Sequence, residues 1–135
     1  MHNTKILIVD DDMGMRSQLK WSLSEYEVIT ADSRIHALEL FNLHLPSLVT
    51  LDLGLPPDAD GTTEGFATLD AILKKAPHTK VVIVSGAEVT TNAEKAKSQG
   101  AYDYHPKPLE IACLKELIKK AFDDYQSDSD DSRHA

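Results

Sequence analysis

Acidic, hydroxyl and basic residues follow separate apolar segments of the chain, and together they suit the transfer of a phosphoryl group. Asp10–Asp12 come after the first such segment, Asp52 after the third, Ser85 after the fourth and Lys107 after the fifth. A carboxylate can accept a phosphoryl group, and hydroxyl and ammonium groups can bind its oxygens. Each residue alone is explained as readily by a helix cap, a turn or a solvated side chain. Their joint occurrence predicts one phosphoryl-transfer site.

The carboxylates in this set also predict a divalent cation. Carboxylates that converge on one place disfavour each other's ionisation unless a cation lies between them. The donor atoms are all oxygen, and the chain's single cysteine, Cys113, lies far along the sequence. Oxygen ligands of this kind favour Mg²⁺, which prefers one or two carboxylates together with a phosphate oxygen and water.

Short apolar segments alternate with helical patterns along the chain, which predicts five βα units. We expect strands at 6–9, 28–30, 48–51, 81–84 and 101–104. Apolar residues at helical spacing follow each of them, and the helix expected at 89–98 presents mostly alanine to the core, so we expect it to move easily. Uniformly apolar strands in this alternation indicate an α/β fold with three layers, a doubly wound parallel sheet between helices. The carboxyl ends of its strands share one edge, where ligands bind.

Composition sets the class of protein. The chain has 135 residues, 41% of them hydrophobic, which favours one compact domain. Its net charge of −8 gives no electrostatic support for direct binding of nucleic acid or of a membrane surface by this domain. No apolar stretch approaches the roughly 20 residues that span a bilayer. With a single cysteine and no signal-peptide pattern, we expect a cytoplasmic location.

Half of the net charge lies at the C-terminal end. Residues 123–135 hold five Asp and one Arg, a local charge of −4. The segment from Gln126 to Ser132 has no apolar residue to offset the entropy of ordering. The sequence therefore predicts a domain at 1–122 and an acidic disordered tail or linker at 123–135.

From Lys5 to about Phe122, the sequence resembles a response-regulator receiver domain of the CheY-like type. The matching segments are residues 6–12, 51–53, 84–86 and 104–108. The resemblance implies a (βα)5 flavodoxin-like fold and a place in a two-component system. There, a sensor histidine kinase phosphorylates the receiver, which promotes its own phosphorylation and dephosphorylation and controls an output domain, typically a transcriptional regulator.

The resemblance also implies individual roles for residues of this chain. Asp52 would be the phosphoacceptor, and Ser85 and Lys107 would contact the phosphoryl group. Asp11 would bind Mg²⁺ directly, Asp10 through water and Gly54 through its main-chain carbonyl, and Asp52 would be a further ligand. Tyr104 would turn from an exposed to a buried position on phosphorylation, and the peptide bond between Lys107 and Pro108 would be cis.

A narrower resemblance is to receivers of the sigma-54-type regulators associated with PEP-CTERM/exosortase systems. It rests on residues 51–58, 18–21 and 100–103. It implies an output domain on a C-terminal extension or on a partner. The general resemblance to receivers implies a homodimer on phosphorylation.

Two alternatives stay open. The loop at 55–65, longer than receivers usually have, and Pro106 beside the active lysine would suit a pseudo-receiver that acts as a protein-interaction module without phosphorylation. A phosphohydrolase with an aspartate nucleophile is disfavoured, because one domain of this length offers no cap or deep pocket for a substrate.

Overall fold

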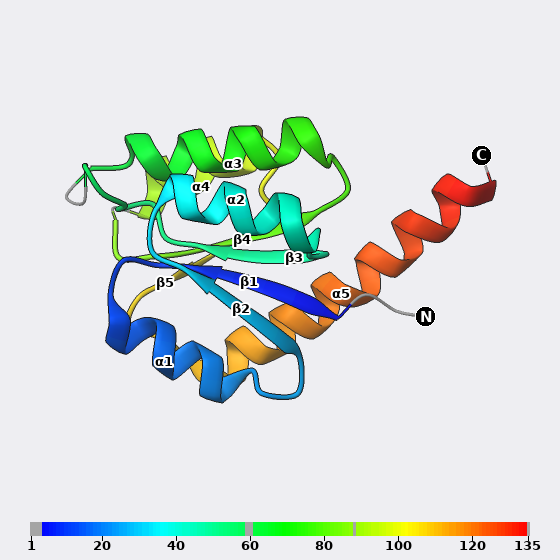
Figure 1. Cartoon of the computed structure of the whole chain (residues 1–135), viewed down its shortest axis with the longest axis horizontal. Coiled ribbons are helices and arrows are strands. Elements are labelled where there is room, and N and C mark those ends of the chain that lie inside the picture. The colour runs from blue at the N-terminus through cyan, green and yellow to red at the C-terminus, as the bar shows by residue number, and fades with distance from the viewer. Residues whose placement is uncertain (1–3, 59–60, 88, 135) are drawn as a thin grey trace.

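The computed structural model describes residues 4–58, 61–87 and 89–134. Strands and helices alternate along the whole of this length (Figure 1). The strands are β1 (Lys5–Val9), β2 (Glu27–Ala31), β3 (Leu48–Leu51), β4 (Lys80–Ser85) and β5 (Asp103–Pro106). The helices are α1 (Met13–Ser22), α2 (Arg34–His44), α3 (Thr63–Lys75), α4 (Val89–Ser98) and α5 (Ile111–His134).

The five strands form one parallel sheet in the order β2-β1-β3-β4-β5. The chain therefore winds outward from β1 in one direction and, after the crossover to β3, in the other. Such a reversal leaves a crevice outside the carboxyl ends of the two central strands. The predicted doubly wound α/β fold is confirmed, and β1 and β3 are the strands that carry Asp10, Asp11 and Asp52 to this crevice.

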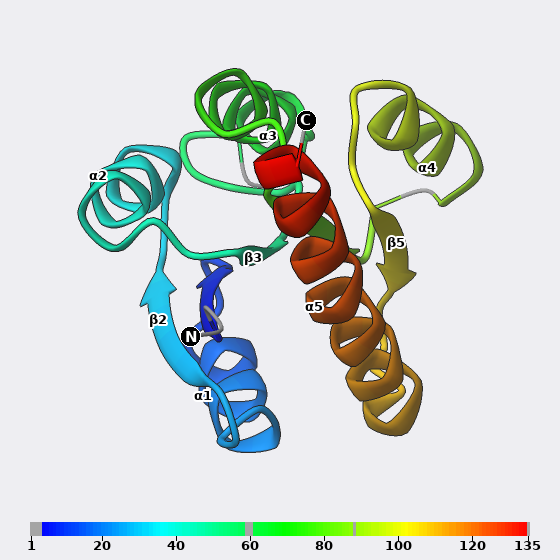
Figure 2. The same ribbon diagram turned by 90° about the vertical axis from the view of Figure 1, so that its right-hand side faces the viewer.

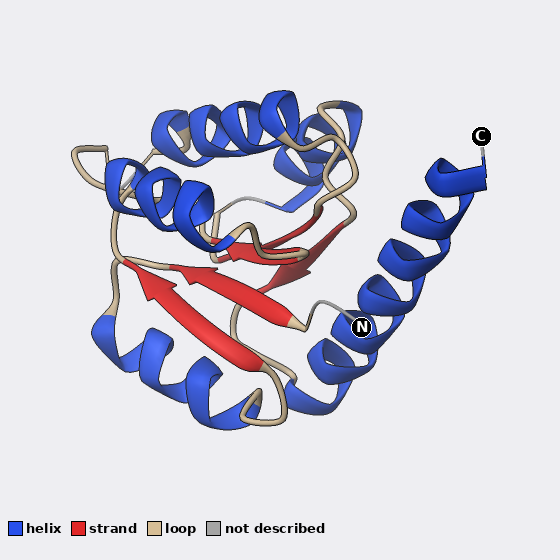
Figure 3. Ribbon diagram, turned by 45° about the vertical axis from the view of Figure 1, so that its right-hand side comes forward, coloured by secondary structure: helices blue, strands red, loops and turns tan. Residues whose placement is uncertain are grey.

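Helices cover both faces of the sheet. Figure 2 shows α2, α3 and α4 on one side and α1 and α5 on the other, and Figure 3 shows the sheet between these layers. Side chains alternate along each strand, so β1 sends Leu7 and Val9 into one core and Ile6 and Ile8 into the other. The three-layer architecture follows from strands that are apolar on both faces.

The helices differ in how firmly they pack. Five residues of α3 are buried, whereas α4 buries Ala96 alone. The small alanine side chain leaves little apolar area to hold α4. This agrees with the weak packing that the alanine pattern predicts.

The last strand differs from its predicted position by two residues. The sequence predicts a strand at 101–104, but β5 spans Asp103–Pro106, with Ser85 opposite Pro106. A proline normally argues against a strand because it has no N–H to donate. Here, β5 is an edge strand, so one side of it needs no hydrogen-bond donors, and Pro106 is accommodated at its end.

The C-terminal segment also differs from the prediction. Helix α5 continues to His134 and extends beyond the sheet (Figure 1), so the expectation of disorder is wrong for residues 123–128. Asp128 forms an ion pair with Lys80, and the Tyr102 hydroxyl donates a hydrogen bond to Asp124. The ammonium group of Lys80 also lies 5.6 Å from the centre of the Tyr102 ring. The prediction weighed apolar residues alone, whereas polar contacts to Lys80 of β4 and to Tyr102, the residue before β5, hold this part of the helix.

Candidate functional site

A pocket of about 320 Å³ lies at the carboxyl edge of the sheet. It contains most of the residues that the sequence singled out for chemistry. Its lining consists of Asp11, Asp52, Gly54, Gly61, Ser85, Gly86, Ala87 and Lys107. Asp10 lies beneath it, almost fully buried at 1% exposure.

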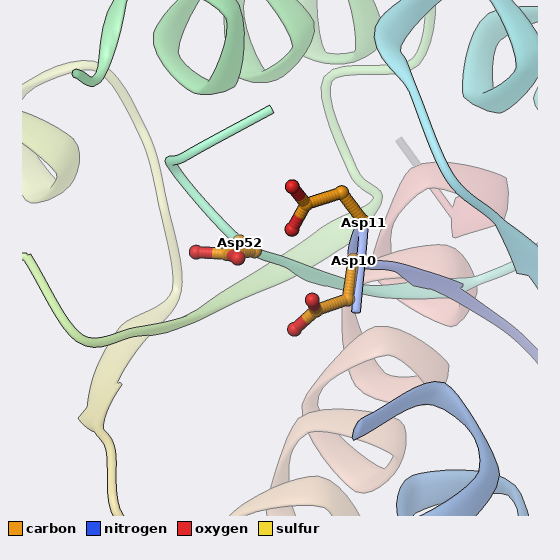
Figure 4. A group of neighbouring side chains, drawn as sticks. All are labelled: Asp10, Asp11 and Asp52. Atoms are coloured by element: carbon orange, nitrogen blue, oxygen red, sulfur yellow. The ribbon is translucent and has the colours of Figure 1, made fainter. Parts of the chain in front are cut away.

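Three carboxylates converge at this pocket. Asp10 and Asp11 follow β1, and Asp52 follows β3 (Figure 4). One carboxylate oxygen from each lies within 4.8 Å of the others. Asp10 and Asp52 are buried, whereas Asp11 is exposed and opens toward solvent. Oxygen atoms this close, with one carboxylate reachable from water, fit the donor set that a hard divalent cation requires.

Asp12, the third residue of the acidic run, does not belong to this cluster. Its side chain caps α1 by accepting a hydrogen bond from the backbone N–H of Gly14, at 2.9 Å. The cap directs the chain from the end of β1 into the helix and leaves the two preceding carboxylates at the pocket.

Lys107 joins the two buried carboxylates. Its Nζ atom lies 2.9 Å from Asp10 Oδ2 and 3.3 Å from Asp52 Oδ2. Burial by itself would lower the pKa of Lys107, but the hydrogen bond and charge of Asp10 and the charge of Asp52 raise the pKa above its usual value. The ammonium group is therefore charged and faces the carboxylate that is expected to accept the phosphoryl group.

The buried position of Asp10 makes its ionised form less favourable. Burial raises the pKa of this carboxyl group, although hydrogen bonds from the Asp12 N–H and from Lys107 act in the opposite direction. Negative charge at Asp10 is thus costly in the metal-free protein. A cation at the pocket would lower that cost.

Ser85, Ala87 and Tyr104 form a connected group beside the pocket. The buried Ser85 hydroxyl oxygen accepts a hydrogen bond from the Ala87 N–H at 3.3 Å. The Tyr104 hydroxyl donates to the Ala87 carbonyl at 3.2 Å, and the tyrosine side chain is 9% exposed. Tyr104 is therefore already in a buried position in this structure.

Gly54 and the peptide bond after Lys107 complete the set of features that the sequence singled out. Gly54 lines the pocket, and its N–H donates to Asp52 Oδ1 at 3.2 Å. The peptide bond between Lys107 and Pro108 is cis, as expected. Sequence reasoning missed the roles of Gly61 and Ala87 in the lining. Both contribute through the backbone or through small size, and neither carries a chemical group that a sequence pattern reveals.

Comparison with known proteins gives a consistent result. The family model described as response regulator receiver domain matches residues 6–119. Chemotaxis protein CheY of Listeria monocytogenes is 32% identical over 120 residues, which are 87% of this chain and 97% of that protein. The DNA-binding transcriptional regulator NtrC of Rhizobium meliloti is 30% identical over 123 residues, 90% of this chain but 24% of that protein.

Solved structures extend the likeness to the fold. The crystal structure of NtrX from Brucella abortus matches with a TM-score of 0.88 and 31% identity, and it covers 100% of this chain and 30% of that one. This chain thus spans nearly the whole length of the CheY relative and about a quarter to a third of the NtrC and NtrX chains. The narrower resemblance to PEP-CTERM-associated regulators stays a prediction.

No helix in the described part of the chain is long and apolar enough to cross a bilayer.

The sheet order, the edge pocket and the family match agree with one another. The chain belongs to the response regulator receiver domain family, the CheY-like signalling domains of two-component systems.

Proposed function

We propose that this receiver accepts a phosphoryl group on Asp52 from the phosphohistidine of a sensor kinase, and that it promotes both this transfer and the later hydrolysis. The observation that carries the proposal is the meeting of Asp52, two further carboxylates and Lys107 in one pocket open to solvent. A nucleophile, a cation and a set of metal-binding oxygens are the parts that phosphoryl transfer requires.

The transfer is a displacement at phosphorus. An Asp52 carboxylate oxygen forms the new P–O bond while the P–N bond to the donor imidazole breaks, and the electron pair of that bond stays on the imidazole nitrogen. The product is an acyl phosphate on Asp52 and a neutral histidine on the kinase, after proton exchange with solvent. Lys107, 3.3 Å from the Asp52 oxygen, is placed to balance charge on the incoming phosphoryl oxygens.

The pocket fits Mg²⁺ as the cofactor. Asp11 and Asp52 would bind the ion directly, Asp10 through water, and Gly54 through its carbonyl oxygen. When bound, the ion neutralises charge on the phosphoryl oxygens and on the carboxylates. The chain's own part is to hold three carboxylates within reach of one another and to keep Lys107 charged beside them.

Ser85 and Tyr104 are the proposed switch residues. A phosphoryl group on Asp52 adds acceptor oxygens in the pocket that Ser85 lines. A Ser85 hydroxyl that donates to them would pull on the Ala87 N–H, to which it is now bonded. Ala87 in turn holds the Tyr104 hydroxyl, so the change would reach β5.

The signal would then leave the domain through a protein partner. We propose that α4 shifts most readily, because Ala96 is the only residue that it buries in the described structure, and that phosphorylation favours a homodimer that controls an output domain. Relatives such as the Rhizobium meliloti NtrC, a DNA-binding transcriptional regulator, support a transcriptional output. A cytoplasmic location fits a kinase partner of this kind.

The experiment is phosphorylation by a small donor. The chain is incubated with phosphoramidate and Mg²⁺, and the phosphorylated fraction is followed by intact mass. Asp52→Asn is expected to abolish the mass gain, and Asp70→Asn, a matched change at an exposed residue of α3, is expected to leave it unchanged. An unphosphorylated wild-type chain would favour the pseudo-receiver alternative.

A further inference from the structure

The loop that carries Lys107 has few backbone hydrogen-bond donors of its own. It runs from Pro106, the last residue of β5, to residue 109, just before Glu110 and α5. Pro106 and Pro108 stand on either side of Lys107, and neither has a backbone N–H. The Lys107 N–H donates to the Ser85 carbonyl at 3.0 Å, which ties the entry of the loop to the end of β4. The C-terminal end of the loop needs a hydrogen bond, here called a tie, if the ammonium group of Lys107 is to stay in place.

The side chain of His105 supplies a tie at that end. His105 belongs to β5 and stands opposite Val84 in the sheet. Its Nε2 atom lies 3.2 Å from the backbone N of Glu110 and accepts that N–H. Glu110 also accepts the Leu114 N–H at its carbonyl, at 2.9 Å, so it marks the start of the α5 hydrogen-bonding pattern. The imidazole thus joins the strand before the loop to the helix after it.

We propose that His105 is a positioning residue for phosphoryl transfer, which holds the loop closed so that Lys107 faces Asp10 and Asp52. This inference rests on the proposed function of Asp52. The imidazole does not touch the reacting atoms and acts through the loop. Reacting groups displaced by about 1 Å commonly lose about 10²-fold in rate, so a loosened loop should be measurable in the chemistry.

The tie depends on one protonation state. Nε2 accepts a proton only in the neutral imidazole whose hydrogen is on Nδ1, and the imidazolium has no acceptor. Burial lowers the pKa of His105, while the charges of Glu110 and Asp103 act against this. Asp103, on β5, is itself paired with Lys97 of α4 at 3.3 Å, and Val84 of β4 is apolar. The tie is therefore present at neutral pH and is lost on acidification.

Two substitutions separate the hydrogen bond from the bulk of the side chain. In His105→Gln, the amide oxygen can occupy the place of Nε2 and accept the Glu110 N–H, but it does not titrate. In His105→Leu, the acceptor is absent. His36→Leu is the matched control, since His36 lies on α2 and pairs with Asp32 rather than with the loop.

The initial rate of phosphorylation by phosphoramidate with saturating Mg²⁺ is measured from pH 8 down to pH 5.5 for each variant, beside a thermal melt. At pH 7.5, His105→Leu is expected to be about tenfold slower than the wild type. His105→Gln and His36→Leu should stay within about twofold of it. The ratio of the wild-type rate to the His105→Gln rate should fall as the pH falls, because only the wild type loses its tie. This ratio cancels the pH dependence of the donor and of the carboxylates.

The outcomes are distinct. If the wild type is not phosphorylated on Asp52, the proposed function itself fails. If the wild type is phosphorylated and His105→Leu keeps its rate, or lowers only the melting temperature, the positioning role is wrong. A His105→Gln rate as low as that of His105→Leu would also overturn it. If His105→Leu does not fold, the pH dependence of the wild-type to His105→Gln ratio decides, and a flat ratio contradicts the proposal.

Discussion

At the scale of the residue, the sequence predicts which groups meet but not how each is held. Asp10, Asp52 and Lys107 were expected at one edge because parallel strands end on the same side. The different burial of Asp10 and Asp11 was not predictable, because adjacent aspartates look alike in sequence. In the structure, Asp10 is buried and Asp11 is exposed. The tie between His105 and Glu110 was also beyond reach, because it depends on the path of a loop.

The buried hydroxyl of Thr50 is expected to lower the stability of the fold without contributing to the site. Among the described residues, its Oγ1 is the buried side-chain atom that lacks a hydrogen-bond partner. Thr50 lies in β3 between Ile8 and Val82. Thr50→Val should therefore raise the free energy of unfolding by about 1 kcal/mol, as measured by urea denaturation. A loss of stability would show that the hydroxyl has a partner, such as water, in solution.

The raised pKa of Asp10 gives the metal effect a pH dependence. A carboxyl group whose pKa is higher in the folded state than its ordinary 3.8 stabilises the fold below that value, and this contribution is lost as the pH rises through the folded-state pKa. In the metal-free protein, the ionised Asp10 thus lowers the stability of the fold as the pH rises toward neutral. Mg²⁺ at about ten times its dissociation constant should add about 1.4 kcal/mol.

Thermal melts in EDTA and in Mg²⁺ between pH 5 and pH 8 test this expectation. The Mg²⁺-dependent rise in melting temperature should grow with pH, because the ion replaces protons on the carboxylates. A rise that is equal at all pH values, or larger in acid, would contradict the assignment of Asp10 to the metal site.

At the scale of the element, four strands were predicted within one or two residues, and the exceptions have local causes. Strand β5 lies two residues later than predicted, because an edge strand accommodates Pro106 at its end. The start of α3 was not predictable from periodicity. Near this start, Gly65 approaches the backbone of Leu53 closely, and its N–H donates to the Leu53 carbonyl at 3.2 Å.

Gly65 of α3 lies very close to the backbone of Leu53, so a larger residue there should destabilise the fold. A Cβ atom built there would lie 2.3 Å from the Leu53 Cα and 2.5 Å from the Leu53 carbonyl oxygen. Both are backbone atoms, so α3 or the Asp52 segment would have to move. Gly65→Ala should lower the free energy of unfolding by about 2–3 kcal/mol and slow phosphorylation as well.

The matched control is Gly86→Ala, whose new Cβ would meet nothing closer than 3.9 Å. It should change the stability by less than about 1 kcal/mol in the same urea titration. Equal losses for the two variants would mean that packing against Leu53 is not the cause.

At the scale of the whole molecule, the sequence predicts the three-layer domain but not the length of its last helix. Helix α5 continues past Phe122, and Lys80 and Tyr102 contact it at Asp128 and Asp124. Helix α5 extends beyond the sheet (Figure 1), and this part of it contacts Lys80 of β4 and Tyr102, the residue before β5.

Removal of the ion pair between Lys80 and Asp128 should free the C-terminal end of α5 without unfolding the rest of the domain. In Asp128→Asn, amide hydrogen exchange should become faster across residues 124–134 and stay unchanged in the sheet. The loss of stability should be small, about 0.5–1 kcal/mol, because Asp128 is partly exposed. Asp123→Asn, at an exposed position of the same helix, is the control and should exchange as the wild type does. Unchanged exchange in Asp128→Asn would show that the pair does not hold α5.

Asp52 is proposed to carry the phosphoryl group, and chemical trapping can locate that group in the sequence. After reaction with phosphoramidate and Mg²⁺, borohydride reduces an acyl phosphate to the corresponding alcohol, so a phosphorylated aspartate becomes homoserine. Peptide mass spectrometry should find homoserine at position 52 and aspartate at positions 10, 11 and 12. Homoserine at another position, or aspartate at position 52 in a chain that gained phosphoryl mass, would contradict the account.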